Sequence, residues 1–263
     1  MVKDLKIEDF TYHLPEEKIA LYPLDKRDES KLLQFENGEI TSNHFKDLAE
    51  FLPSKSGLFM NNSKVIYARL NFFKETGARI EVFCLEPSNT DPSTAMAALS
   101  NSSWNCLIGN KKKWKGEVLE MQLEGDITLH AELVESRDNN VVAFSWNGQS
   151  TFADILQLAG KVPLPPYMNR EAEAEDYDRY QTVYSKIEGS VAAPTAGLHF
   201  TENVLSSLKQ KNISVDEFTL HVGAGTFRPV KSDTIGEHDM HREYAAIALF
   251  HIGGIPINLR SIS

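Results

Sequence analysis

The sequence predicts a mixed α/β main domain with an inserted small all-β barrel domain. Three observations support this fold class. Short β-rich segments fill the middle of the chain at even spacing, and helix and strand signals flank them on both sides. In addition, 263 residues with 41% apolar side chains are enough for a sizeable core. We place the main domain at 1–63 and 150–263, and the inserted domain at 64–149.

The first part of the main domain contains signals for two helices and a hairpin. Proline at its first turn favours a short helix over 15–21. Strands at 32–35 and 40–45 flank Asn37-Gly38, which is a strong signal for a two-residue hairpin. The segment 46–52 is expected to be helical up to the proline that follows it.

The inserted domain is predicted from short β-rich segments separated by turn residues. They lie at 64–73, 78–85, 104–108, 118–123, 128–134 and 141–146. Many short strands at this spacing are typical of a small barrel or sandwich.

Helical and extended segments return after residue 150. Thr151 is the expected N-cap of a helix over 152–159. Three prolines require an extended chain over 161–167. Thr201 caps a further helix that runs to residue 211, and a strand over 218–222 leads into a glycine-rich turn.

Composition favours a cytoplasmic protein with no membrane contact. The N-terminus, MVKDLKIEDF, is charged and lacks the apolar centre of a signal peptide. The longest apolar stretch, 245–257, is interrupted by Gly and Pro and is shorter than the ~18 residues of a spanning helix. We expect Cys84 and Cys106 to be buried, reduced thiols.

The charge is acidic in total but basic in one region. A net charge of −10 disfavours indiscriminate binding to nucleic acid. The segment 64–115 nevertheless holds eight basic and four acidic residues, and it ends in Lys111-Lys112-Lys113-Trp114-Lys115. This run fits either phosphate contacts beside a stacked base or a solvated hairpin tip.

Candidate catalytic residues cluster between 199 and 241. Four of the eight histidines lie there, near small-residue turns at 194–197 and 223–226. Histidine exchanges protons near neutral pH, and glycine allows a ligand to approach the backbone. One alternative is a metal hydrolase, in which His238 and His241 lie on one helical face and His221 or Glu243 is the third ligand. The residues by themselves do not identify the reaction.

Long motifs occur in order along the chain. They occupy 9–20, 64–70, 76–82, 163–167, 180–184, 189–201, 219–230 and 237–244. The most specific is Gly-Ser-Val-Ala-Ala-Pro-Thr-Ala-Gly-Leu-His-Phe-Thr at 189–201. With these motifs the chain resembles the S-adenosylmethionine:tRNA ribosyltransferase-isomerase family of queuosine biosynthesis, in a C-terminally shortened form.

The resemblance implies a mixed α/β domain with an inserted barrel, and it implies a reaction. The ribosyl part of S-adenosylmethionine is transferred to 7-aminomethyl-7-deazaguanine in the wobble position of tRNA and is isomerised, which gives epoxyqueuosine and releases adenine and methionine. The implied partners are this tRNA and S-adenosylmethionine, for a monomer that needs no metal and no other cofactor.

The resemblance also suggests site residues. His199 and His221 are the alternative candidates for the catalytic base, Arg228 is the candidate partner of the methionine carboxylate, and Phe227 or Tyr184 is the candidate platform for adenine. The Lys111, Lys112 and Lys113 run becomes a candidate tRNA contact. The remaining expected binding residues are Arg69, Thr195, Gly197, Gly223, Gly225, Thr226, His238, His241 and Glu243.

Two departures from the family pattern bear on activity. Asn61-Asn62-Ser63 stands where the family has an Asn-Asp-Thr-type segment, so a carboxylate is replaced by an amide. After Tyr244 the family's Gly-Thr-Thr-Ser, Asn-Phe-His-Leu-Pro and Tyr-Arg-Phe-Phe-Ser blocks do not occur. The alternative function is therefore a catalytically inactive tRNA- or nucleoside-binding remnant of the family.

Overall fold

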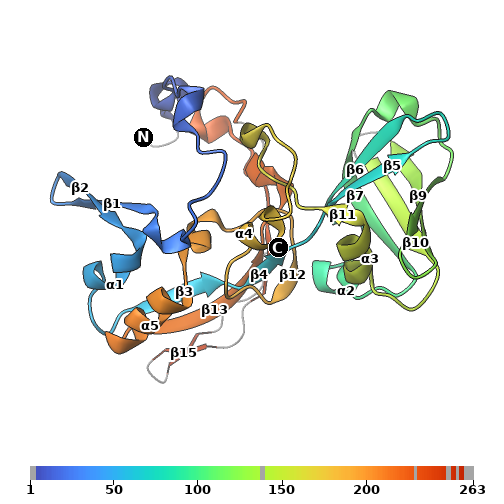
Figure 1. The fold of residues 1–263 in the computed structure, drawn as a ribbon. Coiled ribbons are helices and arrows are strands. Elements are labelled where there is room, and N and C mark those ends of the chain that lie inside the picture. Colours follow the sequence, from blue (N-terminus) through green and yellow to red (C-terminus); the bar gives the residue numbers. More distant parts are fainter. Residues whose placement is uncertain (1–3, 137–139, 228–229, 247–249, 253–254, 258–263) are drawn as a thin grey trace.

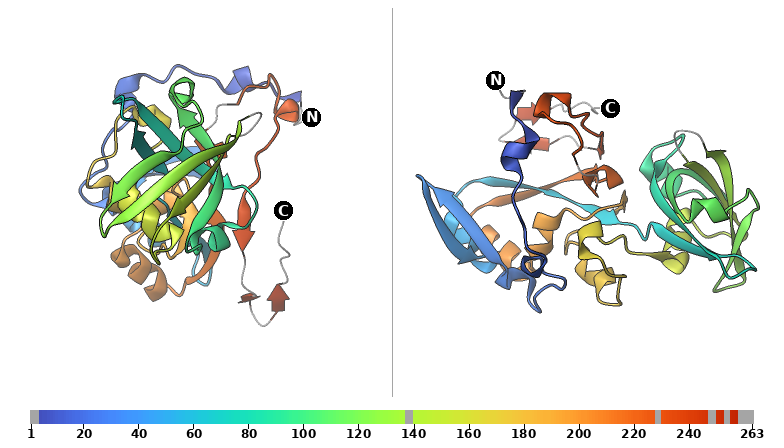
Figure 2. Two further views of the ribbon diagram at one scale, coloured as in Figure 1. Left: turned by 90° about the vertical axis from the view of Figure 1, so that its right-hand side faces the viewer. Right: turned by 90° about the horizontal axis from the view of Figure 1, so that it is seen from above.

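A computed structural model describes residues 4–136, 140–227, 230–246, 250–252 and 255–257. The protein is strand-rich and mixed α/β, as predicted. A curled sheet forms one end of the molecule, and the remaining elements form the other end (Figures 1 and 2). The boundaries of the two predicted domains stay a prediction.

The curled sheet contains seven antiparallel strands in the order β11-β5-β6-β7-β10-β9-β8. Their bounds are β5 Arg69–Phe73, β6 Arg79–Pro87, β7 Asn101–Gly109, β8 Leu119–Leu123, β9 Ile127–Ser136, β10 Asn140–Trp146 and β11 Gly160–Lys161. This order leaves β8 and β11 as edges, so the sheet is a curled half-barrel, where the sequence predicted a small barrel. Helix α3 (Phe152–Ala159) contacts β5, β8 and β11 and so covers the open side.

The core of the half-barrel explains why α3 is held there. The ring of Phe152 is fully buried and lies 5.4–5.5 Å from the rings of Trp104, Phe144 and Trp146. Thr151 caps α3 in a reciprocal capping box with Asp154, as its sequence position predicted. Burial of these aromatic rings gives the curled sheet a continuous apolar interior.

The rest of the described chain contains four small groups of strands. β1 (Lys31–Glu36) and β2 (Glu39–His44) form the predicted hairpin, in which Asn37 and Gly38 both have positive φ. β3 (Gly57–Asn61) pairs in parallel with β13 (Ser214–His221), which also pairs with β14 (Tyr244–Ala246). The other pairs are β4 (Ser63–Val65) with β12 (Ile187–Ser190), and β15 (Phe250–Ile252) with β16 (Ile255–Ile257).

Four short α-helices complete the α-helical part: α1 Leu48–Phe51, α2 Pro92–Met96, α4 Asp176–Arg179 and α5 Glu202–Gln210. Helix α5 begins at Thr201, whose hydroxyl accepts from the N–H of Val204, as predicted. The predicted helix over 15–21 is only a 3-10 turn, Glu16–Lys18. None of the described helices combines the length and apolar character that crossing a bilayer requires.

Candidate active site

The end of strand β13 opens into a cavity of about 460 Å³. Segments far apart in the sequence form its walls: the end of β6, Pro92, Gly189, the turn after β13, and the strand entry before β14. The lining residues are Leu85, Glu86, Pro87, Pro92, Gly189, His221, Gly223, Ala224, Gly225, Asp239, Met240, His241, Arg242, Glu243 and Tyr244. Its size is that of a small-molecule site.

His221 is the buried histidine of this cavity. It is the last residue of β13, it is 4% exposed, and its ring stacks on that of Tyr244 with centroids 5.9 Å apart. Its Nδ1 atom is buried and has no hydrogen-bond partner among the described residues. Burial lowers the pKa of the imidazole below its ordinary value, because the charged form loses solvation. His221 is therefore a neutral imidazole near neutral pH, which is the form that accepts a proton.

Glycines allow the histidines to pack directly against the backbone. A Cβ atom on Gly189 would lie 2.6 Å from Nδ1 of His221, and one on Gly225 would collide with the ring of His241. Gly189 also has φ of +143°, a conformation that side chains with a Cβ rarely adopt. These glycines thus set the positions of the two rings.

Glu243 is a partly buried carboxylate of the cavity, which Glu86 and Asp239 also line. One oxygen, Oε2, accepts a 2.7 Å hydrogen bond from the N–H of Gly223, and Oε1 lies 3.1 Å from Nε2 of His241. Burial raises the pKa of Glu243, while the contacts with Gly223 and His241 act in the opposite direction. The cavity therefore combines a neutral histidine with a desolvated carboxylate, two groups suited to proton transfer.

Asn61 joins the strands that carry the site. Its side-chain amide donates to the carbonyl of Leu220 and its Oδ1 accepts from the N–H of the same residue, both at 2.9 Å. Ser63 donates its backbone N–H to the same oxygen at 3.1 Å. The side chain of Asn61 thus fixes the backbone of Leu220, the residue directly before His221, and that of Ser63. We call these hydrogen-bonded residues the frame of the site.

Ser190 completes that frame. Its hydroxyl lies 2.6 Å from Oγ of Ser63 and accepts from the N–H of Val222 at 3.0 Å, and the residue is fully buried. Asn61, Ser63 and Ser190 were not predicted from the sequence to be positioning residues. The sequence signal that could have indicated them is the presence of polar residues within apolar strands, because a buried polar group requires a hydrogen-bond partner.

The structure brings together five of the residues expected from the sequence and separates the others from them. His221, Gly223, Gly225, His241 and Glu243 line the cavity. His199 instead lies 5.4 Å from the ring of Phe45, centroid to centroid, at the edge of a different core cluster.

The remaining expected residues lie in several places. Gly197 is against the hydroxyl of Tyr184, whose pKa burial raises to about 12, and Thr195 is exposed beside them. Phe227 packs against the half-barrel core, Thr226 is exposed, and His238 follows a 3-10 turn. Arg228 lies outside the described residues.

The metal-hydrolase alternative fails on geometry. Residues 238–243 are not helical, so the predicted shared helical face of His238 and His241 was wrong. Within the described part of the chain, no three His, Cys, Asp or Glu side chains form a group that could hold a metal ion.

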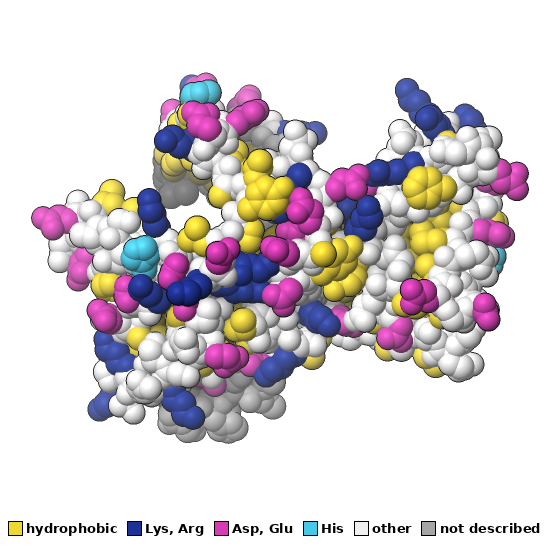
Figure 3. All heavy atoms as spheres, viewed as in Figure 1, with side chains coloured by type: hydrophobic (Ala, Val, Ile, Leu, Met, Phe, Trp, Pro, Cys, Tyr) yellow, Lys and Arg dark blue, Asp and Glu magenta, His cyan; other side chains and the backbone are white. Residues whose placement is uncertain are grey.

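The basic run lies at one tip of the half-barrel. Lys111–Lys113 form a 3-10 turn after β7, with Lys112 and Lys113 exposed, and Lys and Arg side chains gather at this tip in Figure 3. Trp114 is 5% exposed and donates its indole N–H to the carbonyl of Glu117 at 2.7 Å. Of the two alternatives for this run, a base stacked on the tryptophan does not fit, because the ring lies in the half-barrel core.

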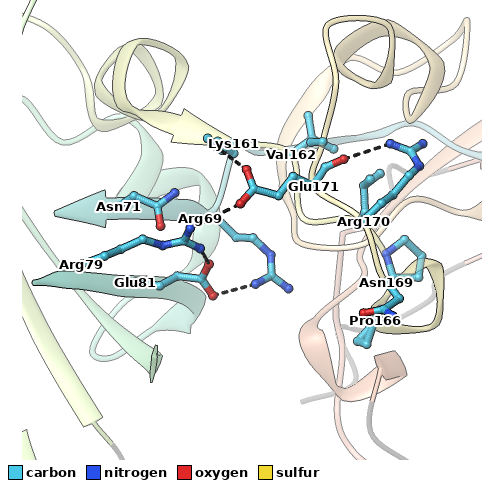
Figure 4. A pocket seen from close by; sticks show the side chains of 13 residues that line it. Arg69, Asn71, Arg79, Glu81, Lys161, Val162, Pro166, Asn169, Arg170 and Glu171 are labelled. Atoms are coloured by element: carbon cyan, nitrogen blue, oxygen red, sulfur yellow. Dashed lines mark hydrogen bonds and ion pairs between the residues drawn. The ribbon is translucent and has the colours of Figure 1, made fainter. Parts of the chain in front are cut away.

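Arg69 lies in a second cavity of about 400 Å³, between the half-barrel and the segment 161–172 (Figure 4). Its guanidinium is 2.8 Å from Glu81 and lies over the ring of Phe83. Arg69 thus lines a different cavity from the five residues gathered around His221. Cys84 and Cys106 are buried and unbridged, as predicted.

Comparison with known proteins identifies the family. One solved structure, titled S-adenosylmethionine tRNA ribosyltransferase from Thermotoga maritima, is 23% identical, with a TM-score of 0.32, and the match covers 90% of this chain and 60% of that one. The chain therefore spans about 60% of the length of that protein. The family model described as queuosine biosynthesis protein matches residues 7–252. That match includes the whole of the His221 cavity, and the chain belongs to the queuosine biosynthesis protein family.

Proposed function

We propose that this chain transfers and isomerises the ribosyl part of S-adenosylmethionine onto 7-aminomethyl-7-deazaguanine in the tRNA wobble position, and that the His221 cavity is where this happens. Family membership over residues 7–252 supports the reaction class. The observation that carries the choice of cavity is that the buried, neutral imidazole of His221 and the carboxylate of Glu243 line the same cavity.

The proposed reaction begins with removal of a proton by His221. The sulfonium of S-adenosylmethionine acidifies the carbon that joins sulfur to ribose, and a neutral imidazole takes its proton. The resulting ylide expels adenine, which takes up a proton, and methionine leaves as a neutral thioether after the amine has attacked. Burial suits this step, because a low-dielectric site strengthens the electrostatic interactions that hold a charged substrate in place.

Glu243 is proposed to act on the nucleophile. The primary amine of 7-aminomethyl-7-deazaguanine attacks only when it is neutral, so its ammonium form must lose a proton. A carboxylate whose pKa is raised by burial is a stronger proton acceptor than an exposed one. The hydrogen bond from Gly223 fixes the orientation of this carboxylate, and His241 lies on its other oxygen.

The binding roles expected for the other residues remain proposals. Arg228 is proposed to pair with the methionine carboxylate, and Lys111, Lys112 and Lys113 to contact tRNA phosphates. His199, Tyr184, Thr195 and Gly197 lie around a different core cluster, so a direct role for them requires the substrate to extend beyond the His221 cavity.

Release of free adenine tests the proposal. The protein is incubated with S-adenosylmethionine and tRNA carrying 7-aminomethyl-7-deazaguanine, and adenine is measured by chromatography. We expect adenine only with that tRNA, and a loss of about 100-fold or more in His221→Asn. His130→Asn, which makes the same change on strand β9, is the control and should retain turnover.

Two outcomes contradict the proposal in different ways. Tight tRNA binding with no adenine release from the folded protein indicates the inactive binding remnant. Full turnover in His221→Asn together with loss in His199→Asn moves the base to His199.

A further inference from the structure

The second cavity contains an unusual arrangement of charges. Four cationic and two acidic side chains line it, beside an apolar wall of Val162, Leu164, Pro165 and Pro166. The cations are Arg69, Arg79, Lys161 and Arg170, and the acids are Glu81 and Glu171. Figure 4 shows Glu171 reaching from one wall toward the half-barrel strands on the other.

Two of the four cations are fixed by structural partners. Arg170 forms a bidentate pair with Asp176 at 2.6 and 2.8 Å and lies over the ring of Tyr22. Arg69 is 2.8 Å from Glu81 and is stacked on Phe83. Their side chains are 12% and 26% exposed, so both are held firmly in the walls.

The other two cations, Arg79 and Lys161, meet at Glu171. One carboxylate oxygen is 3.3 Å from Nη1 of Arg79, and the other is 3.2 Å from Nζ of Lys161. Arg79 comes from strand β6 and Lys161 from strand β11, so a single carboxylate bridges two cations of the half-barrel. Arg79 is also 3.3 Å from Glu81, which is again a long contact.

Glu171 is held weakly. Its side chain is 68% exposed, and those of Arg79 and Lys161 are each 44% exposed. Exposed ion pairs of this kind contribute little to stability and are screened by salt. Lys161, and then Arg79, lower the pKa of Glu171, so its carboxylate is charged at neutral pH.

A phosphate group has the features needed to replace this carboxylate. It offers more oxygens than a carboxylate to the fork of Arg79 and the ammonium of Lys161, and it can carry a second negative charge. The apolar wall of prolines and aliphatic side chains lies beside the cations, where the base or sugar of a nucleotide would be covered. The volume of about 400 Å³ is in the range of sites for such ligands.

We propose that Arg79 and Lys161 form a binding site for the phosphate of a nucleotide, and that Glu171 occupies this site as an internal competitor. The phosphate belongs either to a free mononucleotide or to a nucleotide within an RNA strand. In both cases Arg79 and Lys161 would bind the same phosphate oxygens. This inference does not depend on the proposed reaction, because it concerns a different cavity and needs no turnover.

Replacing Glu171 tests the proposal, because the proposal predicts that phosphate affinity rises. If Glu171 competes with phosphate, Glu171→Gln tightens binding, whereas a carboxylate that only clamps the fold gives no gain when it is removed. The control is Glu175→Gln, which removes the same charge from the same acidic run but does not line the cavity. Lys161→Gln and Arg79→Gln remove the proposed ligands, and Lys161→Arg retains the charge.

Binding is measured by calorimetric titration with AMP and, separately, with a short single-stranded oligouridylate, at low ionic strength. We expect Glu171→Gln to bind on the order of 5- to 10-fold more tightly than the wild type. Glu175→Gln should match the wild type, Lys161→Gln and Arg79→Gln should abolish the gain when combined with Glu171→Gln, and Lys161→Arg should keep it. Circular dichroism and thermal midpoints verify that each variant is folded.

The two probes separate the two sources. A gain with AMP alone assigns the site to a free mononucleotide, and a gain with the oligouridylate assigns it to an RNA strand. Affinity in Glu171→Gln no greater than in Glu175→Gln for both probes overturns the proposal. Adenine release is measured independently, so that outcome leaves the proposed reaction untouched.

Discussion

The backbone of Gly189 lies against the imidazole of His221, so closely that a methyl group on the glycine would require the ring to move. Gly189 is on β12 and His221 ends β13, so the contact joins two strands that are not partners in the same sheet. The position of the proposed base therefore depends on a residue that has no side chain.

Gly189→Ala is expected to lower both stability and turnover. The substitution forces a Cβ into a backbone conformation that disfavours it, at a cost of about 1–3 kcal/mol, and it displaces the His221 ring. Thermal unfolding and adenine release measure the two effects. Gly148→Ala is the control, because Gly148 has φ of +95° with open space around it, so it should lower stability but retain adenine release.

The depressed pKa of His221 predicts a pH effect on stability. The unfolded chain binds a proton near the ordinary value of 6.5, while the folded protein binds it only at lower pH. The free energy of unfolding should therefore fall as pH drops below 6.5 toward the folded pKa, and be unaffected by this group above that range. Urea unfolding of the wild type and of His221→Asn between pH 5 and pH 8 tests this; a difference that does not vary with pH contradicts it.

Glu243→Gln should reduce turnover in a way that higher pH restores. The amide keeps an acceptor for the N–H of Gly223 but cannot take a proton from the substrate ammonium. We expect a fall of about 10- to 100-fold near neutral pH, with partial recovery as solvent deprotonates the amine. The pH profile of kcat/KM distinguishes this role from a structural one, for which the loss would be the same at every pH.

Lys112 and Lys113 should contribute to the salt dependence of tRNA binding. Removal of one phosphate interaction lowers the slope of log affinity against log salt by about 0.7–0.9, so the Lys112→Ala/Lys113→Ala variant should have a slope shallower by about 1–2. The doubly substituted Lys18→Ala/Lys209→Ala variant, with two exposed lysines elsewhere, is the charge-matched control. If the salt dependence has the same slope in the two variants, Lys112 and Lys113 make no specific contact with tRNA phosphates and only keep the tip solvated.

Thr151→Ala should destabilise the protein by about 1 kcal/mol. The threonine accepts from the N–H of Asp154, whose carboxylate in turn accepts from the backbone of Thr151, so the substitution removes half of the capping box of α3. Urea unfolding provides the measurement, with Thr151→Ser as the variant that preserves the cap. Equal stability of the alanine and serine variants would show that α3 is held by packing of Phe152 alone.

The parts of the fold that could be predicted from the sequence are those set by neighbouring residues. Asn37-Gly38 determines a hairpin turn through its own backbone preferences, and Thr151 and Thr201 cap helices that begin at the next residue. The position of α3 over the open side of the half-barrel depends instead on its packing against β5, β8 and β11, which no local pattern encodes.

The same distinction applies to the site. His199 and His221 both lie in specific motifs, but a motif does not predict which of the two shares a cavity with Glu243. The parallel pairing of β3 with β13 and the hydrogen bonds of Asn61 place His221 at the cavity, and these contacts join residues about 160 positions apart. For Trp114 the neighbouring residues were misleading. It lies within a run of lysines, which suggested an exposed ring, but its side chain is buried in the core.

The walls of the His221 cavity come from five separate stretches of the chain, and the last of them is 239–244. During synthesis on the ribosome, the second cavity has all of its lining residues once residue 172 has emerged, whereas the His221 cavity is incomplete until Tyr244 has followed. A nascent chain stalled between these two points would contain the Arg79–Lys161 cations but lack the last wall of the His221 cavity.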